Sequence, residues 1–165
     1  MNAQSRRNAI MEVLKAEEKP VSASTLAKQF NVSRQIIVGD IALLRAGGAD
    51  LSATPKGYVL AREREGLVRS IVCKHSGTKE MAQELNICVD HGCCVLDVIV
   101  EHPVYGQLAG QLQLSTRYDV SQFLESVAQD KAHVLSELTD GIHLHTLRCP
   151  DEDAFQRVRT ALDAA

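Results

Sequence analysis

Long apolar segments are missing from this chain. Its 165 residues contain no stretch of about 18 uncharged apolar side chains, the length that suggests a membrane-spanning helix. Arg6 and Arg7 near the N-terminus are not followed by an apolar signal segment. Membrane insertion and secretion are therefore not indicated, and we expect a cytoplasmic protein without a membrane partner.

Paired-cysteine motifs are missing as well. The five cysteines form an odd-numbered set in which no two are spaced as C-x-x-C, which argues against a disulfide framework and against a zinc ribbon. Free cysteine is among the most buried residue types, so we expect most of the five to be small core residues. Hydrophobic residues make up 45% of the chain, enough for one medium domain or two small ones.

Charge is divided unevenly along the chain, although the net charge is only −3. Residues 1–64 carry ten Lys/Arg against six Asp/Glu, a net charge of +4, and the remainder carries eight against fifteen, a net charge of −7. A basic half favours a polyanion as its partner. The run Arg62-Glu63-Arg64-Glu65-Gly66 separates the halves and predicts two domains, 1–64 and 65–165.

The first region has the pattern of a helix-turn-helix. Apolar residues recur at helical spacing in three segments, and the second and third begin at a serine typical of an N-cap. The tight turn between these two predicts that the third helix is the recognition helix of a DNA-binding unit. The segments are Ser5–Lys15, Ser22–Asn31 and Ser33–Gly47.

A hairpin-like pattern follows the recognition helix. Two short alternating segments flank Lys56-Gly57, which fits the wing of a winged helix. Ser33, Arg34 and Gln35 open the recognition helix, and the last two can make multidentate hydrogen bonds to base edges. Lys56 at the wing tip is a candidate for a phosphate contact. The alternative is that these side chains are ordinary solvated residues.

The second region alternates strand-like and helical patterns. The order β-α-β-β-α-β, followed by a helix, predicts an α+β protein whose C-terminal domain is a two-layer α/β sandwich of the split βαβ (βαββαβ) type. Its helices are expected on one face of the sheet. Asp119 is the expected cap of the helix at 120–132, and Asp151 or Pro150 is expected to open the last helix. The segments are 67–75, 78–89, 94–101, 107–114, 120–132, 142–147 and 151–162.

All six histidines lie in this second region. His143 and His145 are two residues apart in a strand-like run, so both imidazoles point to the same face. His75 ends the first strand of the region, and Glu84 lies on the helix that follows, from which it can reach the sheet. Three imidazoles and one carboxylate suit a borderline divalent ion such as zinc or nickel. The alternative is that the histidine pair consists of ordinary strand residues.

A second polar motif surrounds His102. In the run Glu101-His102-Pro103-Val104-Tyr105-Gly106 a strand ends at a proline turn. His102 can orient a ligand there or cap the end of the strand.

These motifs resemble those of one known family. The run SRQIIVGDIALLR at Ser33–Arg45, followed by ATPKGY at Ala53–Tyr58, resembles the winged helix of the niacin-responsive transcriptional repressors of NAD biosynthesis. The runs VIVEHPVYG at Val98–Gly106 and GIHLHT at Gly141–Thr146 are similar to that family's C-terminal three-histidine domain. The matching motifs occur in order over nearly the whole chain.

The resemblance implies a cytoplasmic, dimeric repressor that binds operator DNA of NAD biosynthesis or niacin transport genes when nicotinic acid is present. A divalent metal, zinc or nickel, would stabilise the regulatory domain or hold the effector. Neighbouring helical residues point about 100° apart, so a shift of the helix by one residue would turn Glu84 away from the histidines. Glu80 would then be the alternative carboxylate ligand. The assigned residues are His75, Glu84, His143 and His145 for the metal and His102 and Tyr105 for the effector.

Other functions remain open at this stage. If the metal is itself the signal, the protein is a metal-responsive regulator. A hydrolytic metal enzyme is disfavoured because the sequence lacks an HExxH pattern and because four protein ligands leave little room for an activated water. A biotin-ligase-type repressor shares the winged helix, but residues 65–165 are too few for that catalytic domain. We therefore expect no enzymatic activity.

Overall fold

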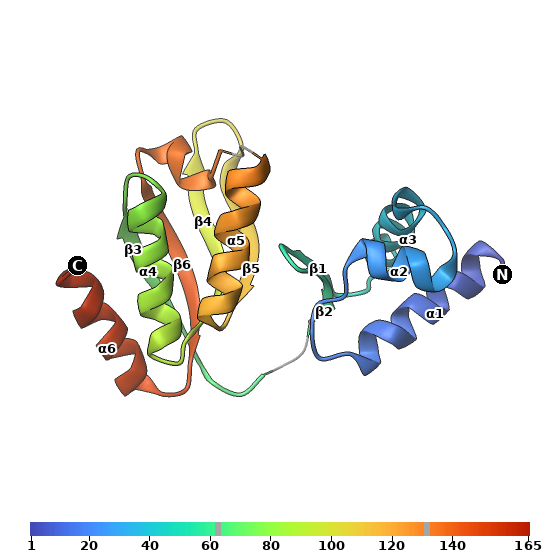
Figure 1. Cartoon of the computed structure of the whole chain (residues 1–165), viewed down its shortest axis with the longest axis horizontal. Coiled ribbons are helices and arrows are strands. Elements are labelled where there is room, and N and C mark those ends of the chain that lie inside the picture. Colours follow the sequence, from blue (N-terminus) through green and yellow to red (C-terminus); the bar gives the residue numbers. More distant parts are fainter. Residues whose placement is uncertain (62–63, 131–132) are drawn as a thin grey trace. The chain divides into compact units, whose positions relative to one another are not determined.

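Two compact units make up the chain, Met1–Glu63 and Arg64–Ala165, and each has its own hydrophobic core. The computed structural model describes residues 1–61, 64–130 and 133–165. Figure 1 shows the first unit as helices with a small hairpin and the second as a sheet covered by helices. Arg62 and Glu63 of the predicted linker and Ala132 at a predicted helix end lie outside the described residues.

The first unit is the predicted helix-turn-helix. It contains α1 (Ala3–Ala16), α2 (Ala23–Phe30) and α3 (Arg34–Ala46). Both predicted serine caps are present, because the Ser22 and Ser33 side chains accept hydrogen bonds from the third residue of each following helix. Asn31 ends α2 in the left-handed conformation, which makes the turn into α3 tight. The core side chains include Ile10, Leu14, Leu26, Ile37 and Ile41.

An ion pair ties α1 to α3. The Asp40 carboxylate is 3% exposed and accepts a hydrogen bond from Arg6 Nε at 2.6 Å, while Arg7 Nη1 lies 3.5 Å from it. The Asp40 contact raises the pKa of Arg6. Two of the basic residues that predicted a polyanionic partner are therefore paired within the unit, and the charge available to such a partner lies on other residues.

The wing is a two-stranded hairpin, β1 (Leu51–Thr54) paired antiparallel with β2 (Gly57–Leu60). Val21, between α1 and α2, forms an additional bridge to Tyr58 and attaches the hairpin to the helices. Gly57 has φ +133°, and a side chain there would collide with the Val21 backbone. In the Lys56-Gly57 pair that predicted the wing, Lys56 lies in the turn and Gly57 lets the hairpin backbone come close to Val21.

The sheet of the second unit has the strand order β3-β6-β4-β5, with all neighbours antiparallel. Consequently β3 and β4 run parallel with β6 between them, and α4 connects them as a split βαβ unit. The same holds for β5 and β6, which β4 separates and α5 connects. The predicted fold class is confirmed. The elements are β3 (Leu67–Lys74), α4 (Thr78–Asp90), β4 (Cys94–His102), β5 (Gly106–Leu114), α5 (Arg117–Asp130) and β6 (Ile142–Cys149).

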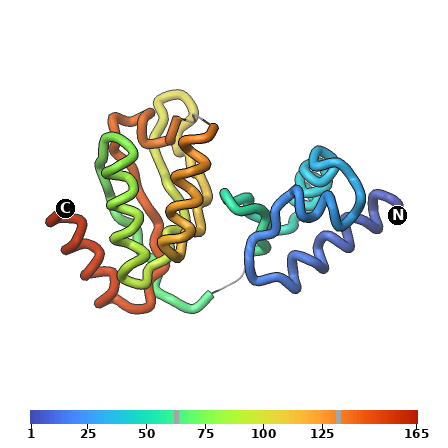
Figure 2. The backbone as a smooth tube through the Cα atoms, in the orientation of Figure 1, coloured from blue at the N-terminus to red at the C-terminus, as the bar shows by residue number. Residues whose placement is uncertain are grey.

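Helices cover one face of this sheet. Figures 1 and 2 show α4 and α5 crossing it side by side, and α6 (Glu152–Asp163) packs against α4, β3 and β6. The core between the layers includes Leu85, Leu114, Leu147 and Phe155. No helix in the described part of the chain combines the length and the apolar character needed to cross a membrane.

The start of α5 differs from the prediction. Asp119 was expected as the cap, but α5 begins earlier, at Arg117. Thr116 Oγ1 accepts a hydrogen bond from the Asp119 amide, and the Asp119 carboxylate accepts from the amides of Ser115 and Thr116. Asp119 is therefore the inner member of a reciprocal capping box. Asp151 caps α6 as predicted, and the short 3-10 helix Leu135–Thr139 was not predicted.

Candidate metal centre and DNA-binding surface

Strand β6 carries the histidine pair into the core of the second unit. Because β6 lies between β3 and β4, one of its faces is covered by the helices. His143 and His145 both point to that face and are 1% and 3% exposed. The same-face geometry expected from their spacing is confirmed.

Glu84 on α4 is the point on which the imidazoles converge. Its Oε1 lies 2.8 Å from His143 Nε2, 2.7 Å from His145 Nε2 and 3.9 Å from His75 Nε2. The ring centroids of His75 and His143 are 4.7 Å apart, as are those of His143 and His145. The three predicted imidazole ligands thus surround one oxygen of the fourth, the buried Glu84 carboxylate.

Backbone carbonyls orient two of the imidazoles. His143 Nδ1 lies 2.8 Å from the Gly141 oxygen, and His145 Nδ1 lies 2.6 Å from the Asp97 oxygen. A carbonyl can only accept, so Nδ1 carries the proton in both rings and Nε2 faces Glu84. Metal-binding histidines typically donate their second ring N–H to a carbonyl or carboxylate in this way.

Gly141 allows His75 to approach the pair. The His75 amide donates a hydrogen bond to the Gly141 oxygen, the same atom that accepts from the His143 ring. Gly141 has φ +85°, and a Cβ there would collide with the His75 carbonyl oxygen. The glycine that precedes the His-x-His run is therefore part of the site's geometry.

Burial and the Glu84 contacts set the charge of the cluster. Burial raises the pKa of Glu84, but hydrogen bonds from His143 and His145 oppose it, and the resulting pKa is lowered to about 2. Burial lowers the pKa of His75. For His143, burial also acts to lower the pKa, but the contacts with Glu84 outweigh it, so the pKa of His143 is raised. The carboxylate is consequently ionised at neutral pH, the state that binds a cation.

The cluster fits a divalent metal ion by spacing and donor type. Ligand atoms about 2.1 Å from a tetrahedral zinc ion are about 3.4 Å apart. The Nε2–Oε1 distances of 2.7, 2.8 and 3.9 Å bracket that value. Three imidazole nitrogens and one carboxylate oxygen suit zinc or nickel, and four protein donors are typical of a site that retains its ion.

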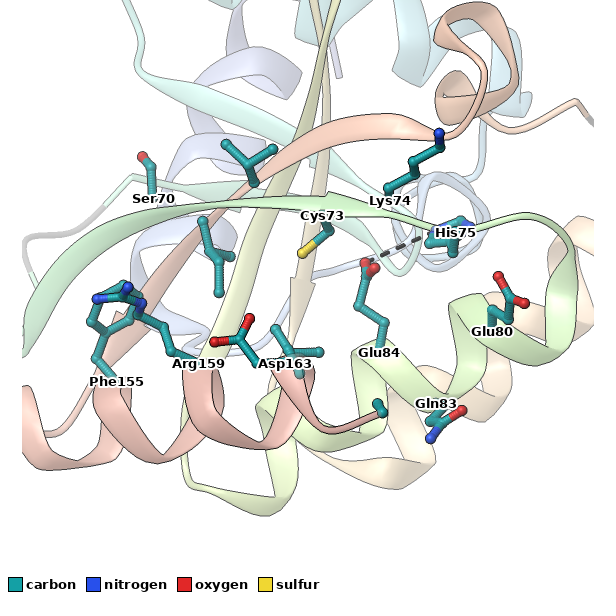
Figure 3. A pocket seen from close by; sticks show the side chains of 14 residues that line it. Ser70, Cys73, Lys74, His75, Glu80, Gln83, Glu84, Phe155, Arg159 and Asp163 are labelled. Atoms are coloured by element: carbon teal, nitrogen blue, oxygen red, sulfur yellow. Dashed lines mark ion pairs between the residues drawn. The ribbon is translucent and has the colours of Figure 1, made fainter.

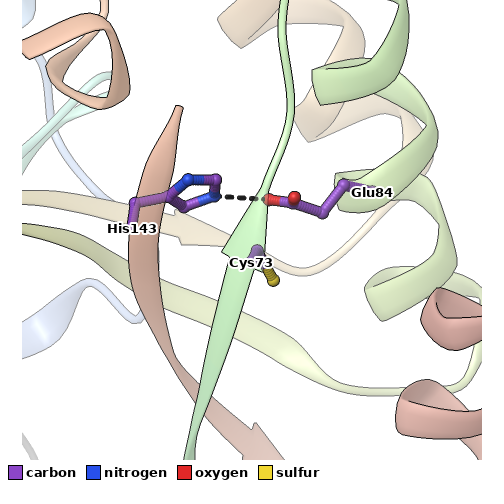
Figure 4. Close-up of side chains that lie close together, drawn as sticks. All are labelled: Cys73, Glu84 and His143. Atoms are coloured by element: carbon purple, nitrogen blue, oxygen red, sulfur yellow. Dashed lines mark hydrogen bonds and ion pairs between the residues drawn. The ribbon is translucent and has the colours of Figure 1, made fainter. Parts of the chain in front are cut away.

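Cys73 is a further donor that the sequence reasoning missed. Its Sγ and the donor atoms of Glu84 and His143 all lie within 4.8 Å of one another. Figure 4 shows these three side chains close together. Burial, followed by the nearby Glu84 charge, raises the pKa of the Cys73 thiol to about 12. Cys73 precedes His75 by two residues and lies opposite His143 in the sheet. The same spacing rule that paired His143 with His145 would have found it.

The structure places the two candidate carboxylates differently. Glu80 lies in the first turn of α4 and is exposed, and its Oε2 accepts a hydrogen bond from the Ser76 amide at 2.7 Å. Glu84 is one turn further along the helix, 6% exposed, and faces the imidazoles. The geometry therefore favours Glu84.

A cavity of about 770 Å³ opens beside the cluster. Figure 3 shows His75, Glu84 and Cys73 on one side of it and Phe155 and Arg159 of α6 on another. Lys74 and Asp163 also line it. Arg159 offers a guanidinium to an anion in this cavity. No sequence pattern indicated Arg159 as a site residue, because α6 and β3 lie at opposite ends of the second region.

The predicted effector residues occupy the turn between β4 and β5. His102 Nδ1 accepts hydrogen bonds from the Val104 and Tyr105 amides, and the His102 and Tyr105 rings are 5.0 Å apart. Tyr105 is 75% exposed. The pair lines neither the 770 Å³ cavity nor a second one of about 640 Å³ that also reaches His75. His102 caps the strand end, and the effector assignment stays a prediction.

The predicted DNA-contacting residues lie on the first unit. Ser33 Oγ accepts from the Ile36 amide, so this hydroxyl is used as a cap. Arg34 and Gln35 are the first two residues of α3 and are exposed. Lys56 lies in the turn between β1 and β2, and its amide donates to Thr54 Oγ1. Arg34 and Gln35 thus occupy the end of the helix that reads bases in helix-turn-helix proteins.

Both units match known protein families. Residues 6–59 match an HTH domain family, and residues 68–165 match the 3H domain family. The transcription repressor NadR of Bacillus subtilis (strain 168) is 43% identical over 164 residues, which cover 97% of this chain and 91% of that protein. The probable transcription repressor NiaR of Thermotoga maritima is 41% identical over 159 residues, covering 96% of this chain and 90% of that protein.

Proposed function

This chain belongs to the 3H-domain transcription repressors, as the motifs of its sequence indicated, and on that premise we propose that it uses nicotinic acid as its co-repressor. Its targets are operators of NAD biosynthesis or niacin transport genes, which it binds in the cytoplasm as a homodimer. The second unit retains a divalent metal through the imidazole cluster. The protein is a repressor rather than an enzyme.

The observation that carries the proposal is the convergence of three imidazoles on Glu84 beside a cavity. The three Nε2 atoms lie within 3.9 Å of one carboxylate oxygen, in the unit that does not contain the helix-turn-helix. Burying the Glu84 charge among imidazoles costs free energy unless a positive charge is paired with it. A divalent cation would supply that charge. A cation next to a cavity provides a place to detect a small anion.

The cavity has the features that nicotinate requires. The effector is a flat anion with a pyridine nitrogen at one side and a carboxylate at another. Arg159 can hold a carboxylate through two parallel N–H donors, and Phe155 offers an apolar surface to the ring. When bound, the metal would place a positive charge at the cavity wall, which favours a bound anion. His75 and Glu84 line the cavity and would hold that metal at its wall.

A dimer would connect effector binding to DNA binding. The effector changes DNA affinity only if it binds unequally to two arrangements of the protein. Two recognition helices on a two-fold axis read half-sites about 34 Å apart or a multiple of it. The helix-free face of the sheet carries exposed Val68, Val72 and Ile142, which are 51%, 68% and 49% exposed. Pairing of two copies would cover such apolar side chains.

Operator binding by the full-length protein tests the proposal. Nicotinic acid should increase the affinity for operator DNA, nicotinamide should have a much smaller effect because it lacks the carboxylate, and prior treatment with a chelator should abolish the response. Electrophoretic mobility or fluorescence anisotropy measures the affinity, and the stoichiometry should be two chains per operator. If nicotinic acid does not change the operator affinity of the metal-loaded protein, the co-repressor assignment is wrong.

Arg159→Gln tests where the effector binds. We expect the nicotinic acid concentration for half-maximal operator binding to rise about 10- to 100-fold, because a charged hydrogen bond to a carboxylate contributes about 1.5–3 kcal/mol. Arg157→Gln on the same helix is the matched control, because Arg157 does not line this cavity. If His102→Ala has the larger effect instead, the effector binds at the β4–β5 turn.

A metal-responsive regulator is the second candidate, because the imidazole cluster would serve it equally well. In that case the operator affinity follows the free metal concentration, and nicotinic acid has no effect at saturating metal. Titration of operator affinity with free metal, without nicotinic acid and at a saturating concentration of it, distinguishes the two candidates.

A further inference from the structure

Two cysteines meet at the end of the second unit that is remote from the imidazole cluster. Cys93 lies in the turn after α4, and Cys149 is the last residue of β6. Their Sγ atoms are 2.7 Å apart, although the residues are 56 positions apart in the sequence. His143 lies near the start of β6 and Cys149 at its end, roughly 20 Å away along an extended strand. The pair is therefore independent of the proposed metal site.

The surrounding packing holds the two thiols together. Each residue is about 1% exposed and belongs to the core under α4 and α6. The Cys93 amide donates a hydrogen bond to the Cys88 oxygen, which fixes the turn, and Cys149 is held by its pairing with Leu67 in β3. A disulfide has a sulfur–sulfur distance of about 2.05 Å. Bond formation therefore requires a sulfur displacement of less than about 1 Å.

A cavity adjoins the two cysteines. A cavity of about 350 Å³ is lined by Cys93, Cys94 and Cys149 together with Gly92, Arg148 and Pro150. This volume accommodates a small two-carbon thiol attached to either sulfur but not a large protein oxidant.

We propose that Cys93 and Cys149 form an intramolecular disulfide by exchange with a low-molecular-weight disulfide. The Cys149 sulfur, as thiolate, attacks one sulfur of the reagent, forms a mixed disulfide and releases one small thiolate. Cys93 then loses its proton and attacks the Cys149 sulfur, which expels the second small thiolate. The two cysteine thiols are oxidised by two electrons in total, and the reagent is reduced to two small thiols.

The order of attack follows from the hydrogen bond between the thiols. The Cys93 S–H donates to Cys149 Sγ, which favours the thiolate at Cys149 and disfavours it at Cys93. Burial raises the pKa of both thiols, that of Cys93 to about 12. Exchange at neutral pH is consequently slow, so this pair reports a sustained change of redox state and not a brief pulse of oxidant.

The bond would join two segments near the point where the chain enters this unit. Gly66 lies so close that a Cβ there would be 2.8 Å from the Arg148 side chain and 3.0 Å from the Cys149 oxygen. A disulfide between residues 56 positions apart strongly reduces the conformational entropy of the unfolded chain. We expect the melting temperature of a domain of this size to rise by roughly 10 °C or more.

Full-length protein equilibrated for hours with 2-hydroxyethyl disulfide tests the proposal, with dithiothreitol-treated protein as reference. After alkylation of remaining thiols, non-reducing peptide mapping should show a bond between Cys149 and Cys93, and the melting temperature of the second unit should rise. The bound metal content should not change. Metal loss without formation of the disulfide would refute the proposal.

Matched variants identify the partner. Cys94→Ser is the control, because Cys94 lines the same cavity. This variant should retain the Cys93–Cys149 disulfide, because the sulfur that lies 2.7 Å from Cys149 Sγ is that of Cys93. Cys93→Ser should lose both the bond and the rise in melting temperature. Wild-type protein with free Cys93 and Cys149 at equilibrium, or with a bond from Cys149 to Cys94, would refute the assignment even if a variant fails to fold.

Discussion

Replacing Glu84 with glutamine should reduce the metal affinity of the purified protein by more than about 100-fold. The substitution keeps the shape of the side chain but removes the charge on which His143 Nε2 and His145 Nε2 converge at 2.8 and 2.7 Å. An amide oxygen is a much weaker ligand for a borderline cation than a carboxylate. Atomic spectroscopy after dialysis should find about one metal ion per wild-type chain and almost none in the variant.

Glu80→Gln is the matched control, because Glu80 lies on the same helix one turn earlier and accepts from the Ser76 amide. It should retain the metal. The nicotinic acid response should disappear in Glu84→Gln and persist in Glu80→Gln, while basal DNA binding by the first unit should be similar in both. If Glu80→Gln loses the metal and Glu84→Gln keeps it, the carboxylate assignment is wrong.

Arg34→Ala should weaken binding to the operator by about 1–3 kcal/mol, roughly 5- to 150-fold, with a much smaller effect on random DNA. Arg34 is the first residue of α3 and is exposed, so its guanidinium can reach the edge of a guanine while Ser33 caps the helix behind it. Loss of a base contact removes discrimination rather than general attraction to phosphate. Competition binding against operator and random duplexes measures the two effects separately.

Lys56→Ala is the contrasting variant on the wing. It should weaken binding to all duplexes equally and reduce the slope of log affinity against log salt by about one, because a single phosphate contact is removed. Arg34→Ala should leave most of that slope in place. Equal losses on operator and random DNA from both substitutions would show that α3 does not read bases through Arg34.

Local patterns in the sequence predicted the elements of this protein well. Ser22 and Ser33 cap helices as expected because an N-cap depends on atoms within three residues of the chain. His143 and His145 share a face because strand geometry depends on neighbouring residues alone. Asp119 was misplaced by three positions, because Thr116 and Asp119 cap each other and the pattern does not say which residue lies outside the helix.

The tertiary structure added Cys73 and Arg159 to the surroundings of the predicted metal cluster. Strand order puts β6 between β3 and β4, and this order brings Cys73 opposite His143. The order of strands and helices along the chain does not state which strands are neighbours in the sheet. The neighbour of each strand therefore cannot be obtained from periodicity. The position of Arg159 in the cavity beside the cluster depends on how α6 packs against β3, a contact between distant segments.

The sequence by itself determined the two units, the helix-turn-helix with its wing, the family and the histidine pair. These depend on short-range spacing, capping and composition, which the residues state directly. The tertiary structure decided which carboxylate faces the histidine pair, since a helix presents Glu80 and Glu84 on similar sides and only packing on the sheet separates them. It likewise decided that Arg6 and Arg7 pair with Asp40 and that Cys93 meets Cys149, because such contacts arise only when distant segments fold together.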